Sequence, residues 1–114
     1  MCGIYAGTDP KEYEPVTRSL RLHGAVTSVR LEARFWAILD EMADNEDVTT
    51  PRFLAKLHDE VVELHGEARN FTSLLRVVCA VYLGGRRGRA EAAERPGAVD
   101  HRPEVVRARA AALA

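Results

Sequence analysis

Side chains that could hold a metal ion are few in this sequence and poorly spaced for the task. His58 and His65 lie seven residues apart, so they share one face of an expected helix, and Glu60 and Cys79 are the other possible ligands. None of them forms the compact ligand pair that metal sites use. We therefore interpret both histidines as surface residues and expect no metal and no cofactor. The neighbouring carboxylates are expected to form a solvated face rather than acid–base pairs: Asp59, Glu60, Glu63 and Glu67.

Charge is divided unevenly along the chain, although the 114 residues carry a formal net charge of only −1. Residues 15–36 hold four arginines against one glutamate, and residues 37–67 hold nine acidic residues against two basic ones. Residues 84–114 hold seven arginines against four acidic residues. A polyanion responds to a local basic edge rather than to the average charge. Nucleic acid therefore stays among the expected partners.

A membrane partner is not expected. The longest apolar run, Val77–Leu83, is far shorter than the roughly 20 residues that a spanning helix needs. Two cysteines, Cys2 and Cys79, are too few for a disulfide framework, and the first residues lack a signal-peptide pattern. These features predict a cytoplasmic protein.

Three patterns predict helices in the middle of the chain. The first covers residues 33–44, the second follows a cap at Thr49 or Thr50 and ends at Gly66, and the third covers residues 70–83 after a cap at Asn70. The third pattern is apolar almost all round, so we expect that helix to be buried or covered by another subunit. The first two are defined by apolar residues at helical spacing: Phe35, Ile38, Leu39, Met42, Phe53, Leu54, Leu57, Val61 and Leu64.

The segments on either side are expected to lie outside this domain of residues 25–83. Residues 1–24 are interpreted as an irregular N-terminal arm, because Pro10 and Pro15 interrupt any helix there. Residues 84–114, rich in alanine and arginine, are interpreted as a flexible basic tail.

One short strand is predicted at residues 26–31, which alternate and are rich in β-branched side chains. A single strand leaves its backbone groups unpaired. We expect two copies, one per chain, to form an antiparallel ribbon, and give less weight to pairing with residues 2–6. Leu31 leads into the apolar face of the first helix, so period 2 places Thr27, Val29 and Leu31 inside. The outward set is then Val26, Ser28 and Arg30.

This order of strand, helix, turn and helix, from Arg18 to about Gly66, resembles the ribbon-helix-helix family of bacterial DNA-binding repressors. The stretches Thr17–Gly24, Thr27–Glu32, Phe35–Trp36 and Asn70–Arg76 are similar to an uncharacterised bacterial subgroup of that family. The resemblance implies a mainly α dimer with one short strand per chain, two core helices and a third C-terminal helix. It also implies that the ribbon enters the major groove of double-stranded DNA.

The resemblance assigns roles to particular residues. The base-reading set would be Val26, Ser28 and Arg30, since an arginine fork fits a guanine edge and a valine can contact a thymine methyl. The phosphate-contacting set would be Arg18, Arg21, Thr49, Thr50 and Arg52. The dimer core would be Thr27, Val29, Leu31, Phe35, Trp36, Ile38, Leu39, Met42, Phe53, Leu54, Leu57 and Val61.

The expected function is that of a homodimeric, sequence-specific DNA-binding protein, a transcriptional repressor and not an enzyme. The start Met-Cys-Gly-Ile looks like that of glutamine amidotransferases with an N-terminal cysteine nucleophile, but one strand and three helices cannot build their layered sheet. Two alternatives stay open. One is an antitoxin-like adaptor whose dimer head binds operator DNA while its tail binds a toxin or another protein partner. The other is a scaffold that keeps the fold for dimerisation or higher assembly without DNA, with the third helix as a further surface for a protein partner.

Overall fold

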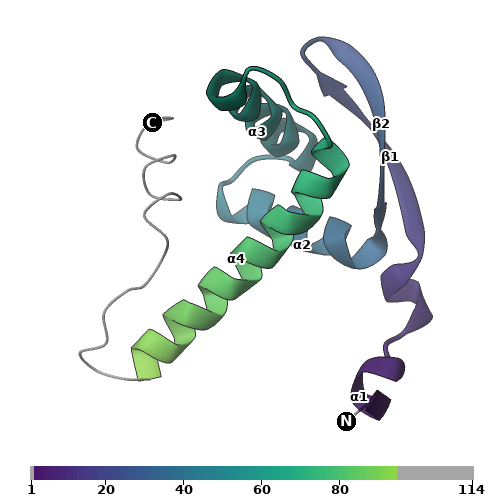
Figure 1. The fold of residues 1–114 in the computed structure, drawn as a ribbon, viewed down its shortest axis with the longest axis vertical. Coiled ribbons are helices and arrows are strands. Elements are labelled where there is room, and N and C mark those ends of the chain that lie inside the picture. Colours follow the sequence, from purple (N-terminus) through teal and green to yellow (C-terminus); the bar gives the residue numbers. More distant parts are fainter. Residues whose placement is uncertain (1, 95–114) are drawn as a thin grey trace. The chain divides into compact units, whose positions relative to one another are not determined.

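The computed structural model describes residues 2–94, with the side chains of residues 2–85. The contacts between residues group the chain into two compact units, Met1–Arg76 and Val77–Ala114. The elements follow in the order α1 (Cys2–Ala6), η1 (Pro10–Tyr13), β1 (Pro15–Leu22), β2 (Ala25–Glu32), α2 (Ala33–Asn45), α3 (Thr50–His65) and α4 (Phe71–Glu94) (Figure 1). None of the helices among the described residues is long and apolar enough to cross a membrane.

The two strands form an antiparallel hairpin within one chain. Pro15 pairs with Glu32 at the open end and Leu22 with Ala25 at the turn. The two turn residues, His23 and Gly24, have φ values of 51° and 77°. Positive φ at both positions is what a type I′ turn requires, and this turn matches the twist of paired strands. The predicted pairing of one strand across a dimer is therefore wrong, because residues 15–22 supply the partner strand.

The expected irregular arm is likewise more structured than predicted. Besides β1 it contains α1 and the 3₁₀ helix η1. Asp9 caps η1 by accepting a hydrogen bond from the backbone N–H of Lys11 at 3.0 Å, and Pro10 occupies the first turn. A proline whose φ already suits a helical turn starts this element instead of interrupting it.

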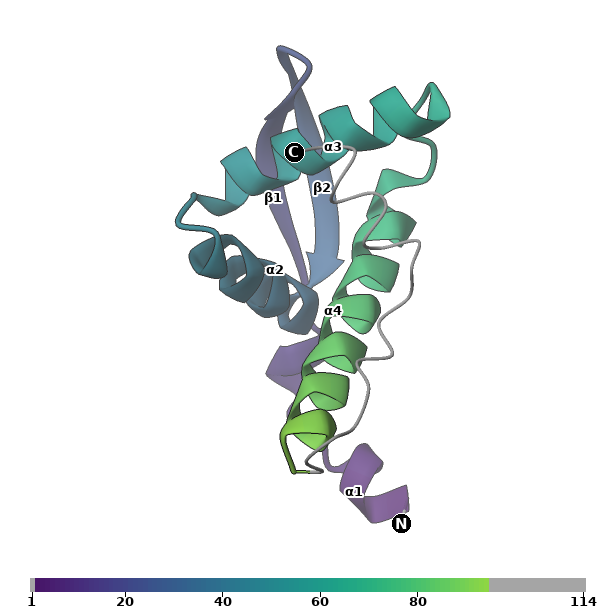
Figure 2. The ribbon, with the colours of Figure 1, turned by 90° about the vertical axis from the view of Figure 1, so that its left-hand side faces the viewer.

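The core lies between the inner face of the hairpin and the two helices that follow it. Both α2 and α3 pack on the strands and on each other, and Figure 2 shows them on the same side of the hairpin. Among the residues predicted for the core of a dimer, those buried within one chain are Val29, Leu31, Trp36, Ile38, Leu39 and Leu54. Leu20 and Leu22 are also buried, although the sequence reasoning left them in the arm.

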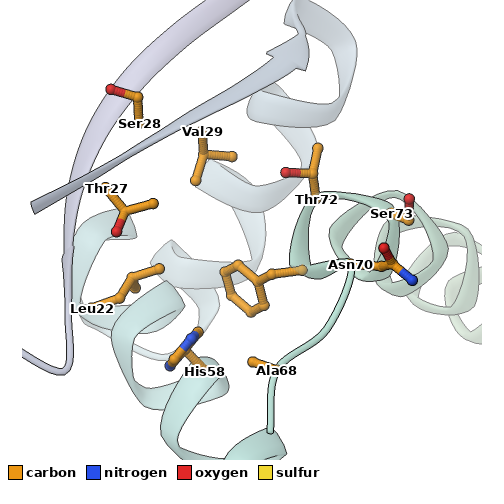
Figure 3. Close-up of a pocket in the computed structure, with 10 residues that line it drawn as sticks. Leu22, Thr27, Ser28, Val29, His58, Ala68, Asn70, Thr72 and Ser73 are labelled. Carbon is orange, nitrogen blue, oxygen red and sulfur yellow. The ribbon is translucent and has the colours of Figure 1, made fainter. Parts of the chain in front are cut away.

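The other predicted core residues are less covered. Those half-buried in one chain are Phe35, Met42, Phe53, Leu57 and Val61. Thr27 is exposed in the single chain, so its predicted place in the core of a dimer stays a prediction. It lies next to the hairpin turn and lines a pocket of about 450 Å³ between the hairpin, α3 and the start of α4. In Figure 3 the hydroxyl of Thr27 points into this pocket, whereas that of Ser28 points away from it.

The three predicted helices are present. The α3 helix begins after the N-cap Thr49 and ends at Gly66, whose φ of 82° is the left-handed conformation that glycine adopts without strain. The α4 helix continues to Glu94, beyond the predicted end at residue 83, so the predicted tail begins with helix. The rest of that tail, residues 95–114, lies outside the described residues. The packing of residues 77–83 against a dimer core stays a prediction.

The hairpin register predicts which side chains of β1 matter for stability. Replacing Leu20, which is 3% exposed, by alanine should lower the free energy of unfolding by about 2–5 kcal/mol, because it leaves a cavity under the hairpin. The matched control is Ser19→Ala on the opposite face, which should change stability by less than about 0.5 kcal/mol. Urea denaturation of both variants checks this. Equal effects of the two changes would show that the strand faces were assigned wrongly.

Candidate nucleic-acid interface

The outer face of the hairpin is a polar surface made by both strands. Period 2 and the register place four cross-strand pairs on it. In the pair at the open end, Pro15–Glu32, Glu32 is half-buried and bonded to Arg76. The other three pairs have all six residues exposed: Thr17–Arg30, Ser19–Ser28 and Arg21–Val26. None of the six is acidic, and two are arginines. Such a face presents hydrogen-bond donors and positive charge on a two-stranded support.

The outward orientation of Val26, Ser28 and Arg30 agrees with the register argued from the sequence. Thr17, Ser19 and Arg21 join them, and the sequence reasoning missed this half of the face. The signal that could have found it is the alternation from Val16 to Leu22, followed by a two-residue connection ending in glycine.

Arg21 lies on this outer face and not in an irregular arm. Its guanidinium Nη1 donates to the backbone carbonyl of Gly24 at 3.4 Å, across the hairpin turn. The side chain is exposed. Its position opposite Val26 makes it part of the same surface as Arg30.

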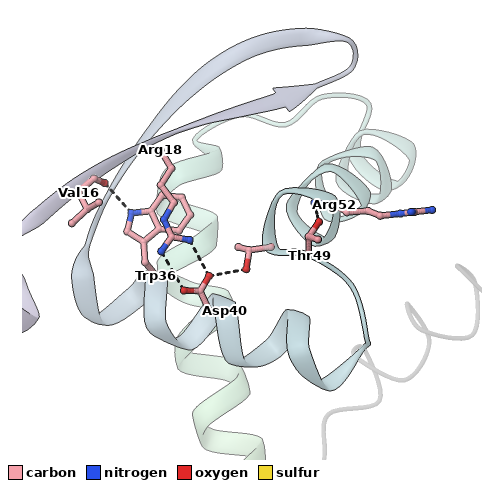
Figure 4. Close-up of polar contacts among 7 residues, drawn as sticks. Val16, Arg18, Trp36, Asp40, Thr49 and Arg52 are labelled. Atoms are coloured by element: carbon pink, nitrogen blue, oxygen red, sulfur yellow. Dashed lines mark hydrogen bonds and ion pairs between the residues drawn. The ribbon is translucent and has the colours of Figure 1, made fainter.

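Arg18, by contrast, lies on the inner face, where it is held by two residues of α2. Its guanidinium forms a two-pronged pair with Asp40, with N–O distances of 2.9 and 3.2 Å, and its central carbon lies 4.4 Å from the centre of the Trp36 ring (Figure 4). The Trp36 indole N–H donates to the carbonyl of Val16 at 2.8 Å. The prediction that Arg18 contacts phosphate is revised, because these contacts direct its charge into the protein.

The start of α3 is also occupied by internal contacts. The Thr50 hydroxyl donates to Asp40 at 2.7 Å, and the Thr49 hydroxyl accepts a hydrogen bond from the backbone N–H of Arg52 at 3.3 Å. The next amide, that of Phe53, donates to the carbonyl of Thr49 at 2.9 Å. Pro51 has no N–H to offer. The predicted phosphate contacts of Thr49 and Thr50 are therefore not retained, whereas the exposed side chain of Arg52 points away from the helix (Figure 4).

Ion pairing sets the charge state of two carboxyl groups beside the hairpin. The hydrogen bonds from Arg18, and secondly from Thr50, hold the pKa of Asp40 below its usual range despite partial burial. At the end of β2, the guanidinium of Arg76 forms two hydrogen bonds with Glu32, of 2.9 and 3.2 Å, and these lower the pKa of Glu32. Both acids are thus ionised at neutral pH and neutralised by an arginine.

The lowered pKa of Asp40 predicts a pH-dependent contribution to stability. Above its unfolded pKa of about 3.9, the ionised carboxylate stabilises the fold, and this contribution is lost as the pH falls through the lowered folded pKa. Asp40→Asn should lower the free energy of unfolding at pH 7 by about 1 kcal/mol, since the pair is partly exposed and screened. The difference from wild type should shrink below about pH 4.

Urea denaturation at a series of pH values measures this difference. Asp44→Asn changes an exposed acid of the same helix and serves as the control, with no comparable loss at pH 7. A difference between wild type and Asp40→Asn that persists unchanged at pH 2 would contradict the role given to the ionised carboxylate.

Comparison with known proteins agrees with this architecture. The model of the ribbon-helix-helix domain matches residues 15–83, from the start of β1 into α4. A solved structure, that of an uncharacterized protein from Bordetella pertussis Tohama I, is 41% identical, with a TM-score of 0.73 over 90% of this chain and 80% of that one. No curated protein matches significantly. Ribbon-helix-helix domains are generally non-enzymatic, dimerise and bind DNA. Since the domain match covers more than half of the sequence, the chain belongs to the ribbon-helix-helix family.

Proposed function

We propose that this protein is a homodimeric, sequence-specific DNA-binding protein that acts as a transcriptional repressor, with the outer face of the hairpin in the major groove. The observation that carries this proposal is the outer face, whose six exposed residues include Arg21 and Arg30 and no acidic residue, while Glu32 at its end is paired with Arg76. A two-stranded ribbon fits the width of the major groove. In this protein one chain already provides both strands.

Each side chain of that face suits a particular contact. Arg30 can reach O6 and N7 of guanine with its two-pronged guanidinium, and Ser28 can bond several bases. Val26, 67% exposed despite its apolar side chain, suits a thymine methyl group. In addition to the base-reading set, Arg21 and Arg52 supply positive charge for contacts with the DNA phosphates. Because the strands pair within one chain, the hairpin needs no partner to form before it binds DNA, which lowers the entropy cost of binding.

The proposed dimer has its support in α3 and not in the strands. In α3, which is described over its whole length, Leu54 is the one fully buried residue. Phe53, Leu57 and Val61 are half-buried, and Leu64 is 41% exposed. A second copy of the chain would cover this apolar stripe. Twofold symmetry would then present two hairpins to one DNA site, as repressor half-sites require.

The reading role of Arg30 is tested by DNA binding. Arg30→Ala should lower the discrimination between specific and scrambled DNA by about 1–3 kcal/mol per contact, and by about twice that when both chains lose it. Arg52→Ala should weaken binding to both DNAs and lower the salt slope of log K by about 0.9 per contact. Binding is measured across a salt series, with the specific DNA taken from selection out of a random library.

The control is Arg69→Ala, which removes an exposed arginine from the loop between α3 and α4. It should leave both discrimination and salt slope unchanged. If Arg30→Ala weakens binding to the two DNAs equally, the outer face does not read sequence. If wild type binds no DNA at low salt, the proposal fails and the scaffold alternative is favoured.

The dimer is tested with a change at the exposed end of the α3 stripe. Wild type should be a dimer by light scattering at micromolar concentration, with a melting temperature that falls on dilution. Leu64→Glu places a charge in the proposed interface and should shift the protein towards monomer, while Glu63→Gln beside it should not. A wild-type protein that is a folded monomer, with a melting temperature independent of dilution, would contradict the proposal.

A further inference from the structure

Three residues that could bind a metal meet where the hairpin turn lies over α3. They are His23 of the turn and His58 and Asp59 of α3. One nitrogen from each imidazole and one oxygen from the carboxylate lie within 4.8 Å of one another. The sequence reasoning considered His58 only with His65, Glu60 and Cys79, because nothing in the local spacing relates His58 to residue 23.

The distances in this cluster are close to those of a metal site. His23 Nδ1 and Asp59 Oδ1 are 3.4 Å apart. Tetrahedral bonds of about 2.0–2.1 Å place two ligand atoms about 3.3–3.4 Å apart, so this pair is already at coordination spacing. The rings of His23 and His58 meet edge to face, with centroids 4.9 Å apart and planes at 76°. The three ligand atoms lie within 4.8 Å of one another, so metal binding requires the third ligand to move closer than it lies here.

The second observation concerns the surroundings of His58. Its Nδ1 atom is buried and has no hydrogen-bond partner among the described residues. A buried polar atom in that state calls for an explanation, and a bound ion is one that fits the neighbouring ligands. Phe71 also helps to position the ring, since the two rings pack edge to face with centroids 5.0 Å apart. His58 also lines the pocket beside the hairpin (Figure 3).

We propose that His23, His58 and Asp59 bind a divalent transition-metal ion of the zinc type, which fastens the hairpin turn to α3. Two imidazoles and one carboxylate are ligands that zinc accepts, with a water molecule in the fourth position. The ion joins two elements that lie far apart in the sequence, the turn at His23 and the middle of α3. Because it binds the folded arrangement and not the unfolded chain, it stabilises the fold.

The experiment uses the full chain without an affinity tag and zinc ion alone as the probe. Isothermal titration should give one zinc per chain, and the melting temperature should rise with zinc concentration. His23→Asn and Asp59→Asn remove ligands that are 53% and 59% exposed, so both variants should fold. Asparagine also tolerates the positive φ at position 23. Each variant should bind zinc at least about tenfold more weakly and lose the zinc-dependent rise in melting temperature.

Two controls separate this site from other ways of binding zinc. His65→Asn changes a histidine of the same helix outside the cluster, and Cys2→Ser removes an exposed thiol. Both should bind zinc as wild type does. Substitution by Co²⁺ should give the visible bands of a four-coordinate ion without a thiolate charge-transfer band. Wild-type protein that melts at the same temperature with and without zinc would overturn the proposal, and so would unchanged affinity in either ligand variant.

Discussion

The carboxylate of Asp40 joins three elements of the domain: β1, α2 and α3. Asp40 lies on α2. Its carboxylate accepts two hydrogen bonds from Arg18 of β1 and a third from Thr50 at the start of α3. Arg18 also stacks on Trp36, and Trp36 bonds back to the strand at Val16. Charge-assisted hydrogen bonds of this kind are directional, so they fix how the hairpin is oriented on the helices as well as contributing to stability. These contacts on the inner face of the hairpin therefore also set the direction in which its outer face points.

The proposed function depends on this separation of the two faces of the hairpin. Leucine and valine side chains hold the inner face in the core, and the same strands leave threonine, serine and arginine on the outer face. The acidic residues that make the chain neutral on average belong mainly to residues 37–67, outside the strands. A near-zero net charge is therefore compatible with a basic surface suited to DNA.

Pairing of the strands within one chain also changes what a second chain has to supply. Hydrogen bonds between β1 and β2 satisfy the facing edges of the strands, so a partner strand is not needed to form the ribbon. Among the apolar surfaces that one chain leaves incompletely covered is the stripe of α3, from Phe53 to Leu64. Dimerisation in this protein would therefore bury side chains from helices, where the gain comes from removing apolar surface from water.

The sequence by itself determined the features that depend on local spacing. The starts and ends of α2 and α3, the cap at Thr49 and the glycine at position 66 follow from side chains a few residues apart, and so does the outward set of Val26, Ser28 and Arg30. Tertiary structure decided the rest. An arginine at an inner position interrupts the apolar alternation of β1, and it is stable there because α2 brings Asp40 and Trp36 to it. Likewise, the turn places His23 beside His58 and Asp59, and no local pattern relates residues so far apart in the chain.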